Sequence, residues 1–264
     1  MDILDRQRAM WTEGDFPDMA KNIEGAAEVI VEAAGVTAGD DVLDVATGTG
    51  NAALIAARRG ARVKGLDLTP KLLAVARERA AAEGADIEFV EGNAQELPYA
   101  DAGFDRVTSV FGSMFAPDHA ATAAELLRVT RPGGTIAVAA WTPQGLNGQM
   151  FAVQGKYMPP PPPGFQPPIL WGLEDYAREL FGGGEARFEH HTSPIDADSA
   201  EHWLSYCERV LGPIVLARAA LEPQGKWEAA RADLLALYEG ANEATDGSYH
   251  ADAEYLVTVV RRAA

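Results

Sequence analysis

The chain has 264 residues, and 47% of them are hydrophobic, which is enough for one large globular domain with a sizeable core. This composition excludes bulk disorder, collagen and a small disulfide scaffold, since Cys207 is the only cysteine. The 39 acidic residues outnumber the 22 basic ones and give a formal net charge of −17, which disfavours binding to nucleic acid and to anionic membranes. No long stretch of the sequence is both apolar and uncharged, so no membrane span is expected, and the single cysteine fits a cytoplasmic location.

The first half of the sequence predicts strands and helices in alternation. Apolar residues at helical spacing predict a helix over residues 23–34, which Gly35 can end. Largely apolar runs are expected to form buried strands at residues 41–45, 61–66, 87–90, 104–110 and 135–141. Helices are expected at residues 51–59, 70–82 and 118–129, with Thr69 as a cap and a turn at 131–134. Such alternation is typical of a mainly parallel sheet with right-handed crossovers.

The second half has a different composition. Residues 159–163 are an unbroken proline run, which predicts a stiff loop or, as a minor interpretation, a ligand for a proline-binding module. A helix is expected over residues 173–180, and two late strands over 185–191 and 254–261. The segment between these strands is expected to be helical, with capping-box spacing at Asp198 and Glu201. We interpret the chain as a single domain with four parts: an N-terminal helical arm (1–35), a core (36–142), a Pro-rich lid and helix (143–185), and the last two strands with an inserted helical cap (186–264).

The sharpest local feature is a glycine-containing turn between a strand and a helix. The strand at 41–45 leads directly into Gly48 and Gly50, and a helix of small residues follows. Glycines allow a tight turn and a close approach of a ligand, and the helix N-terminus offers unpaired N–H groups. Asp67 stands at the end of the next predicted strand, where an acidic side chain commonly accepts hydrogen bonds from a ribose. The arrangement predicts a nucleoside-binding site.

Two kinds of nucleoside ligand can be considered for this turn. Gly48, Gly50 and Ala53 match the dinucleotide pattern G-x-G-x-x-A, so an NAD(P)-dependent oxidoreductase is one interpretation. Asp44, however, lies four residues before Gly48, where its negative charge would repel a pyrophosphate. A ligand with a cationic centre and no phosphate fits this acidic side chain better.

Several segments, in order, resemble the class I S-adenosylmethionine-dependent methyltransferases. Residues 44–50, Asp-Val-Ala-Thr-Gly-Thr-Gly, resemble the family's D-x-G-x-G-x-G loop, with Ala46 in place of the first glycine. Asp67 resembles the family's second-strand acid, and residues 91–98 resemble its G-D-A-x-x-L-P segment, with Asn93 in place of the usual aspartate. Later core segments match at residues 104–105 and 126–134. The chain is most similar to the branch of ubiquinone and menaquinone methyltransferases and small-molecule tailoring enzymes.

The resemblance implies an α/β fold and an enzymatic activity. The fold would be a Rossmann-like, mainly parallel seven-stranded sheet with helices on both faces and an antiparallel last strand. The cofactor would be S-adenosylmethionine, and its methyl group would pass by in-line displacement to a small organic acceptor such as a phenol or quinol.

The resemblance also assigns the cofactor contacts to three segments. The methionine part would be wrapped by the loop residues Ala46, Thr47, Gly48 and Gly50. Asp44 would face its amino group, and Asp67 would take both ribose hydroxyls. The adenine would be met by Leu68, Asn93 and Ala94.

The acceptor would be recognised outside the shared core. Trp11 and Phe16 in the arm could close over the site, and the later candidates are Met150, Tyr157, Trp171, Trp203 and Tyr206. Five histidines are candidates for a general base, and His119 lies near the expected acceptor position, but no pattern identifies a catalytic residue. No metal is expected.

Two alternatives to methyl transfer stay open at this point. One is the NAD(P)-dependent oxidoreductase, and the other is a protein that binds S-adenosylmethionine without transferring its methyl group. The expected partner is a small-molecule substrate, with neither nucleic acid nor membrane, and a homodimer is left open.

Overall fold

The computed structural model describes residues 3–161, 164–182 and 185–263. Within these residues one sheet contains β1 (Asp41–Val45), β2 (Arg62–Asp67), β3 (Ile87–Glu91), β4 (Phe104–Val110), β5 (Thr130–Trp141), β6 (Glu185–Ala197) and β7 (Tyr249–Arg261). The strand order is β3-β2-β1-β4-β5-β7-β6. Strands β1 to β5 are parallel to one another, whereas β7 is antiparallel to β5 and β6. The expected Rossmann-like sheet with an antiparallel last strand is therefore confirmed.

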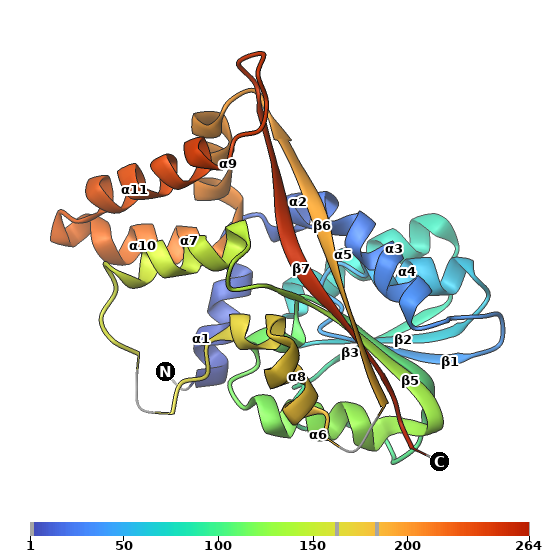
Figure 1. Cartoon of the computed structure of the whole chain (residues 1–264). Coiled ribbons are helices and arrows are strands. Elements are labelled where there is room, and N and C mark those ends of the chain that lie inside the picture. The colour runs from blue at the N-terminus through green and yellow to red at the C-terminus, as the bar shows by residue number, and fades with distance from the viewer. Residues whose placement is uncertain (1–2, 162–163, 183–184, 264) are drawn as a thin grey trace.

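The helices fall into three groups along the chain. Before the sheet come α1 (Ile3–Thr12), α2 (Phe16–Met19), the 3-10 helix η1 (Ala20–Ile23) and α3 (Glu24–Ala33). Between β1 and β6 come α4 (Asn51–Arg58), α5 (Pro70–Glu83), η2 (Ser113–Phe115), α6 (His119–Val129), α7 (Leu146–Gly155), η3 (Pro168–Gly172) and α8 (Glu174–Leu180). Between β6 and β7 come α9 (Ala200–Val210), α10 (Gly212–Leu221), η4 (Glu222–Gln224) and α11 (Trp227–Gly240). Figure 1 shows α3, α4 and α5 over one face of the sheet and α6 and α8 over the other.

The central strands are buried on both faces because helices cover both faces of the sheet. Val42, Leu43 and Val45 of β1 are all fully buried, which explains why this strand reads as a continuous apolar run rather than an alternating one. The neighbouring helix α4 buries the small residues Ala52, Ala53 and Ala56, so it can lie close to β1 and β2. This close packing sets the position of the turn that joins β1 to α4.

A second hydrophobic core lies between the sheet and the inserted helices. Its buried members come from α2, α7, α9, α10, α11 and from the distal halves of β6 and β7, as with Met150, Leu204, Ile214, Leu234 and Tyr249. Helix α1 packs on α10 although the two helices lie far apart in the sequence. In Figure 1 the α9–α11 group stands beyond one end of the sheet, with α1 below it. The arm and the cap thus approach each other next to the carboxyl ends of the parallel strands.

Several element boundaries differ from the sequence-based expectation. The turn expected at 131–134 is part of β5. Gly133 and Gly134 exchange backbone hydrogen bonds with Arg262, which keeps the segment extended. A register shift in the pairing with β4 accommodates the extra residues. Strands β6 and β7 are 13 residues each, longer than expected, since their distal halves pair with each other as a ribbon that the cap covers.

Two expected helix caps also differ. Helix α9 is capped by the Ser199 hydroxyl, which accepts the His202 N–H, and not by Asp198. Thr69 occupies the N-cap position of α5 but makes no side-chain capping bond. Part of the proline run, Pro162 and Pro163, lies outside the described residues.

Candidate functional site

The turn after β1 is built from residues with unusual backbone conformations. Gly48 (φ 56°) and Gly50 (φ 85°) are left-handed, and Gly50 is the N-cap of α4. Ala46 is also left-handed (φ 54°), a conformation that costs a residue with a Cβ roughly 1–2 kcal/mol relative to its usual one. The segment opposite Ala46 is Gly112, where an added Cβ would collide with the Ala46 methyl carbon. The bare backbone at Gly112 therefore makes room for the alanine in the turn.

Asp44 lies beneath this turn at the end of β1. Its side chain is almost fully buried, and its two oxygens accept hydrogen bonds from Thr47 Oγ1 (2.5 Å) and Thr108 Oγ1 (2.8 Å). Burial raises the pKa of this carboxyl to about 6, although the two hydroxyls act in the opposite direction. A cationic group placed next to Asp44 would relieve the cost of burying its charge.

Asp67 lies on the neighbouring strand end and holds the turn directly. Its Oδ2 accepts the Gly48 N–H (2.8 Å), and its Oδ1 accepts the Thr69 N–H (2.8 Å). Burial raises the pKa of Asp67, and these backbone hydrogen bonds lower it in part. Each carboxylate oxygen keeps a second lone pair, so the side chain can still accept hydrogen bonds from a ligand.

The strand ends β1 to β5 border one cavity. Of the sequence-predicted cofactor contacts, the cavity is lined by Asp44, Ala46, Thr47, Gly48, Asp67, Leu68, Asn93 and Ala94. Gly50 does not line it, because it faces Ala76 and Phe89 on the inner side of the turn. The Asn93 oxygen that was expected to meet the adenine amino group accepts the Gln95 N–H (3.0 Å), so only its second lone pair is free.

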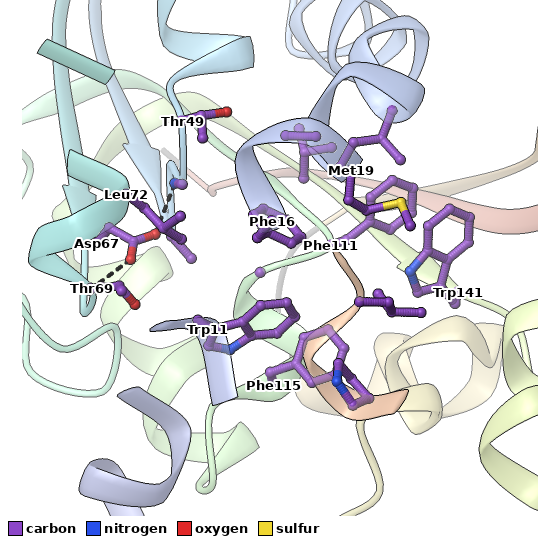
Figure 2. A pocket seen from close by; sticks show the side chains of 18 of the residues that line it. Trp11, Phe16, Met19, Thr49, Asp67, Thr69, Leu72, Phe111, Phe115 and Trp141 are labelled. Carbon is purple, nitrogen blue, oxygen red and sulfur yellow. Dashed lines mark hydrogen bonds between the residues drawn. The ribbon is translucent and has the colours of Figure 1, made fainter. Parts of the chain in front are cut away.

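The arm forms the wall that faces the glycine turn. Trp11 and Phe16, two of the candidate acceptor residues, both line the cavity and meet edge to face with ring centroids 5.1 Å apart. Trp11 also meets Phe115 of η2 edge to face at 4.8 Å. Figure 2 shows Phe16 between the Asp67 side of the cavity and the Phe111 and Trp141 side. The arm therefore covers the place where the two ends of the cavity join.

The far end of the cavity is apolar. Met150 and Trp203 line it, and they are joined by residues that the sequence analysis did not select, namely Met19, Phe111, Phe115, Trp141, Phe151 and Ile195. Phe111 and Trp141 stack face to face with centroids 3.7 Å apart. Phe111 directly follows β4 and Trp141 ends β5, and this position at the carboxyl end of a strand is the signal that could have identified them.

Three predicted acceptor residues do not line this cavity. Trp171 is fully buried on the other side of η2, edge to face with His119 and Phe181. Tyr157 points away from the cavity because its hydroxyl bonds Ala229 O (3.1 Å) and Asp233 Oδ2 (3.0 Å). Tyr206 packs beside Trp203, and its hydroxyl accepts a hydrogen bond from Asn22 (3.3 Å) on the outer side of the arm. Their aromatic character reflects packing of the helices on which they lie.

None of the five histidines lines the cavity. His119 begins α6, is fully buried, and its Nδ1 lies 2.9 Å from the Tyr176 hydroxyl. Burial lowers the pKa of His119 to about 4, so it stays neutral at neutral pH. His190 and His191 extend from the edge strand β6 toward acidic neighbours, Glu174 and Glu254 for the first and Glu189 for the second.

The charge of the cavity restricts its ligands. Among the described residues that line it, Asp44 and Asp67 are the only carboxylic acids, and there is no lysine, arginine or histidine. A diphosphate would meet two buried carboxylates without a compensating cation, whereas a cationic nucleoside would find two partners. The bare backbone at Gly48 on the cavity wall also leaves space for a ligand beside the turn. These features fit S-adenosylmethionine and disfavour a dinucleotide.

Comparison with known proteins decides between these ligands. Residues 42–134 match a family model described as a methyltransferase domain. A demethylmenaquinone methyltransferase of Thermus thermophilus is 41% identical over 116 residues, which span 42% of this chain and 53% of that protein. The chain belongs to the class I S-adenosylmethionine-dependent methyltransferases. The cofactor of this methyltransferase is accordingly S-adenosylmethionine.

Two further matches span more of the chain. An uncharacterized protein of Mycobacterium tuberculosis is 43% identical to the methyltransferase over 216 residues, 80% of this chain and 79% of that protein. The crystal structure of the YcgJ protein of Bacillus subtilis superimposes with a TM-score of 0.62 at 18% identity and covers 91% of this chain and 99% of that one. The fold is thus shared along nearly the whole chain.

The described part of the chain contains neither a membrane-spanning helix nor a cluster of metal ligands. No helix in that part is long and apolar enough to cross a membrane. Among the same residues, no group of three histidine, cysteine, aspartate or glutamate side chains could hold a metal ion.

Proposed function

We propose that this methyltransferase methylates a small, uncharged and largely apolar molecule, such as a phenol or quinol. The observation that carries the proposal is the division of the cavity into two ends. Both carboxylates stand at the end formed by β1 and β2, and the other end is walled by aromatic and aliphatic side chains with no charged group among its described residues. An anionic or cationic acceptor would lose its hydration there without a compensating partner.

At the polar end we assign each cofactor contact to a residue of the cavity wall. Asp44 would pair with the amino group of the methionine part, and Asp67 would accept the ribose hydroxyls with the lone pairs that the backbone leaves free. Leu68, Asn93 and the Ala94 N–H would hold the adenine at the ends of β2 and β3. The turn at Ala46, Thr47 and Gly48 would border the methionine part. Gly50 would stabilise this turn from its inner side, where it caps α4.

The chain would contribute to the reaction by positioning the acceptor next to the methyl group and by excluding water from both. S-adenosylmethionine supplies an electrophilic methyl group, and its transfer requires no proton donor for the departing sulfur. The walls from the arm, η2, α7 and α9 enclose the acceptor beside the glycine turn and exclude water, so proximity can supply much of the rate. No residue of the chain has to form a covalent bond.

The absence of a histidine from the described cavity wall restricts the acceptor chemistry. Tyr238 and Cys207 line the apolar end, but burial raises the pKa of both groups, so they stay protonated and cannot act as bases at neutral pH. We therefore expect an acceptor that is nucleophilic before it is deprotonated, such as an electron-rich ring, whose displaced proton passes to water after the methyl transfer. The curated relative named as a demethylmenaquinone methyltransferase supports a ring of this kind.

Two neutral amides could orient the acceptor. Asn147 of α7 and Gln7 of α1 line the cavity, and within the described residues neither side chain has a hydrogen-bond partner. A carboxamide can both donate and accept, so it suits a hydroxyl or carbonyl oxygen of an otherwise apolar molecule. We expect Asn147→Ala to raise the KM of an oxygen-bearing acceptor and to leave cofactor affinity unchanged.

A labelled methyl donor tests the proposal directly. The protein is incubated with phenols, quinols, amines and carboxylic acids, and methylated products are identified by mass spectrometry. Transfer to neutral phenols or quinols would support the proposal, whereas a preference for carboxylates or phosphates would contradict it. Binding of S-adenosylhomocysteine with no methylated product from any class would favour the alternative of binding without transfer. A cytoplasmic location and a homodimer stay predictions.

A further inference from the structure

The arm places an aromatic ring next to the bare backbone of the glycine turn. A Cβ atom added to Gly48 would have Phe16 Cε1 as its only neighbour within 4 Å, at 3.7 Å. Both residues line the cavity that also contains Asp44 and Asp67. Figure 2 shows the Phe16 ring facing the junction between the carboxylate end and the aromatic end. Phe16 is therefore the aromatic residue of the arm that lies against the turn itself.

Hydrogen bonds on both sides of Phe16 hold the arm in this place. Lys71 of α5 donates from Nζ to Thr12 O (2.9 Å) and Gly14 O (3.3 Å), just before Phe16. Asn51, the first residue of α4, donates from Nδ2 to Ala20 O (2.8 Å), just after it. Both donors belong to helices that begin at the cofactor end of the sheet. The ring is thus positioned by the same elements that form the turn.

Neighbouring aromatic rings restrict how the Phe16 ring can turn. Trp11 meets it edge to face at an interplanar angle of 77°, and Trp11 is in turn held by Phe115 at 78°. The three rings form a row from the glycine turn to the apolar end of the cavity. Such packing keeps a hydrocarbon ring at the junction without adding a polar group there.

The junction is also the place where a positive charge needs a partner. The cavity wall has two carboxylates behind the turn and no basic side chain among its described residues. An aromatic ring attracts a cation within about 6 Å of its centroid, and the attraction is strongest where water is excluded. A neutral thioether carries no charge and is attracted more weakly by the same ring.

From this geometry we propose that Phe16 contacts the sulfonium group of the cofactor and makes the site favour the methyl donor over the demethylated product. The proposal rests on the cofactor placement given under Proposed function. Asp44 and Asp67 would contact parts that the donor and the product share, so their direct contacts do not separate the two. Phe16 does separate them, because the donor carries a positive sulfur and the product does not.

The test compares three nucleosides that share their adenosine and amino-acid parts and differ at the position of the sulfonium group. S-adenosylmethionine carries a sulfonium, S-adenosylhomocysteine a neutral thioether, and sinefungin a protonated amine at the corresponding place. Calorimetric titration of Phe16→Leu should show a roughly 5- to 30-fold loss of affinity for the two cationic ligands and less than about a twofold loss for S-adenosylhomocysteine. Phe16→Tyr, which keeps the ring, should retain the preference of the unmodified protein.

Phe151→Leu is the matched control, since it makes the same change in the same cavity wall but next to Phe115 and away from the turn. It should leave all three affinities unchanged. Equal losses for the three ligands in Phe16→Leu, or none, would overturn the assignment. If Phe16→Leu does not fold, as judged by circular dichroism, Phe16→Met takes its place. Failure of the unmodified protein to bind S-adenosylhomocysteine would instead overturn the cofactor placement.

Discussion

Ala46 and Gly112 are complementary in size across the glycine turn. Ala46 keeps its methyl group in a left-handed conformation (φ 54°), and a Cβ atom at Gly112 would collide with that methyl and lie 2.9 Å from the Ala46 carbonyl oxygen. The departure from the family's loop at Ala46 is thus accommodated by the segment after β4. The two positions are coupled through space although they are distant in the sequence.

This coupling predicts non-additive effects on stability. Gly112→Ala should destabilise the protein by about 1–3 kcal/mol, because the added methyl group overpacks the turn. Ala46→Gly should be nearly neutral, since relief of the left-handed strain is offset by the greater flexibility of glycine in the unfolded chain. The double variant should recover part of the loss, but not all of it, because the Ala46 carbonyl stays close. Urea unfolding of the four proteins measures the coupling, and strictly additive values would show that the two residues do not share this space.

Asp67 provides the second prediction, on cofactor affinity. Asp67→Ala removes a hydrogen-bonding carboxylate and releases the Gly48 and Thr69 N–H groups, so S-adenosylhomocysteine should bind roughly ten- to hundredfold more weakly. Glu91→Ala is the control, because Glu91 ends the adjacent strand β3 but is exposed and pairs only with Arg8 in the described residues. An unchanged dissociation constant for Asp67→Ala would remove Asp67 from the ribose site.

The third prediction concerns pH and Asp44. Since burial raises the pKa of Asp44 to about 6, the folded state binds its proton more tightly than the unfolded chain, and the stability this provides is present below pH 4 and lost as pH rises through 6. Asp44→Asn should show no such loss, so the unbound variant should gain about 3 kcal/mol relative to the unmodified protein between pH 4 and pH 8. Urea unfolding at several pH values measures this difference.

Cofactor binding should show the opposite trend with pH. A cationic amino group near Asp44 favours the ionised carboxylate, so affinity of the unmodified protein for S-adenosylhomocysteine should rise as pH increases from 5 to 7. In Asp44→Asn the affinity should be weaker and nearly constant over this range. A parallel pH profile in both proteins would mean that Asp44 does not face the amino group.

The fourth prediction separates the acceptor end from the cofactor end. Trp203 lines the cavity from α9 and is 8% exposed, so Trp203→Leu should raise the KM of the acceptor roughly tenfold through lost apolar contact. Affinity for S-adenosylhomocysteine should not change. Tyr157→Phe serves as the control, since the Tyr157 hydroxyl bonds α11 outside the cavity. An equal effect of both substitutions would indicate a general loss of folding rather than a contact with the acceptor.

The sequence predicted the sheet well because its elements are determined locally. The apolar run at residues 41–45, the glycines at 48 and 50 and the acid at Asp67 each specify a strand, a turn or a strand end without reference to distant residues. The methyltransferase motifs lie in the same region, so the sequence alone indicates the end of the cavity to which we assign the cofactor.

The acceptor end depends on contacts that sequence spacing does not reveal. Trp171 and Trp203 are both buried aromatic residues on helices, but Trp171 packs behind η2 and Trp203 faces the cavity. Only the positions of η2 and α9 relative to β5 separate these outcomes. Phe111 was missed for a related reason. Its backbone is left-handed (φ 59°), whereas the glycine beside it, Gly112, is not (φ −89°), and the sequence alone does not indicate which of the two residues turns the chain.

The placement of β6 at the margin of the sheet has a consequence for biosynthesis. This strand pairs with β7 alone, and the whole segment between the two strands, which includes α9, α10 and α11, must be synthesised before that pairing can start. During translation the earlier parallel strands can assemble first, while the backbone N–H and C=O groups of β6 have no partner strand. Because long-range pairing of this kind is slow and exposes such edges, we expect aggregation during expression to arise from chains stalled within the α9–α11 segment.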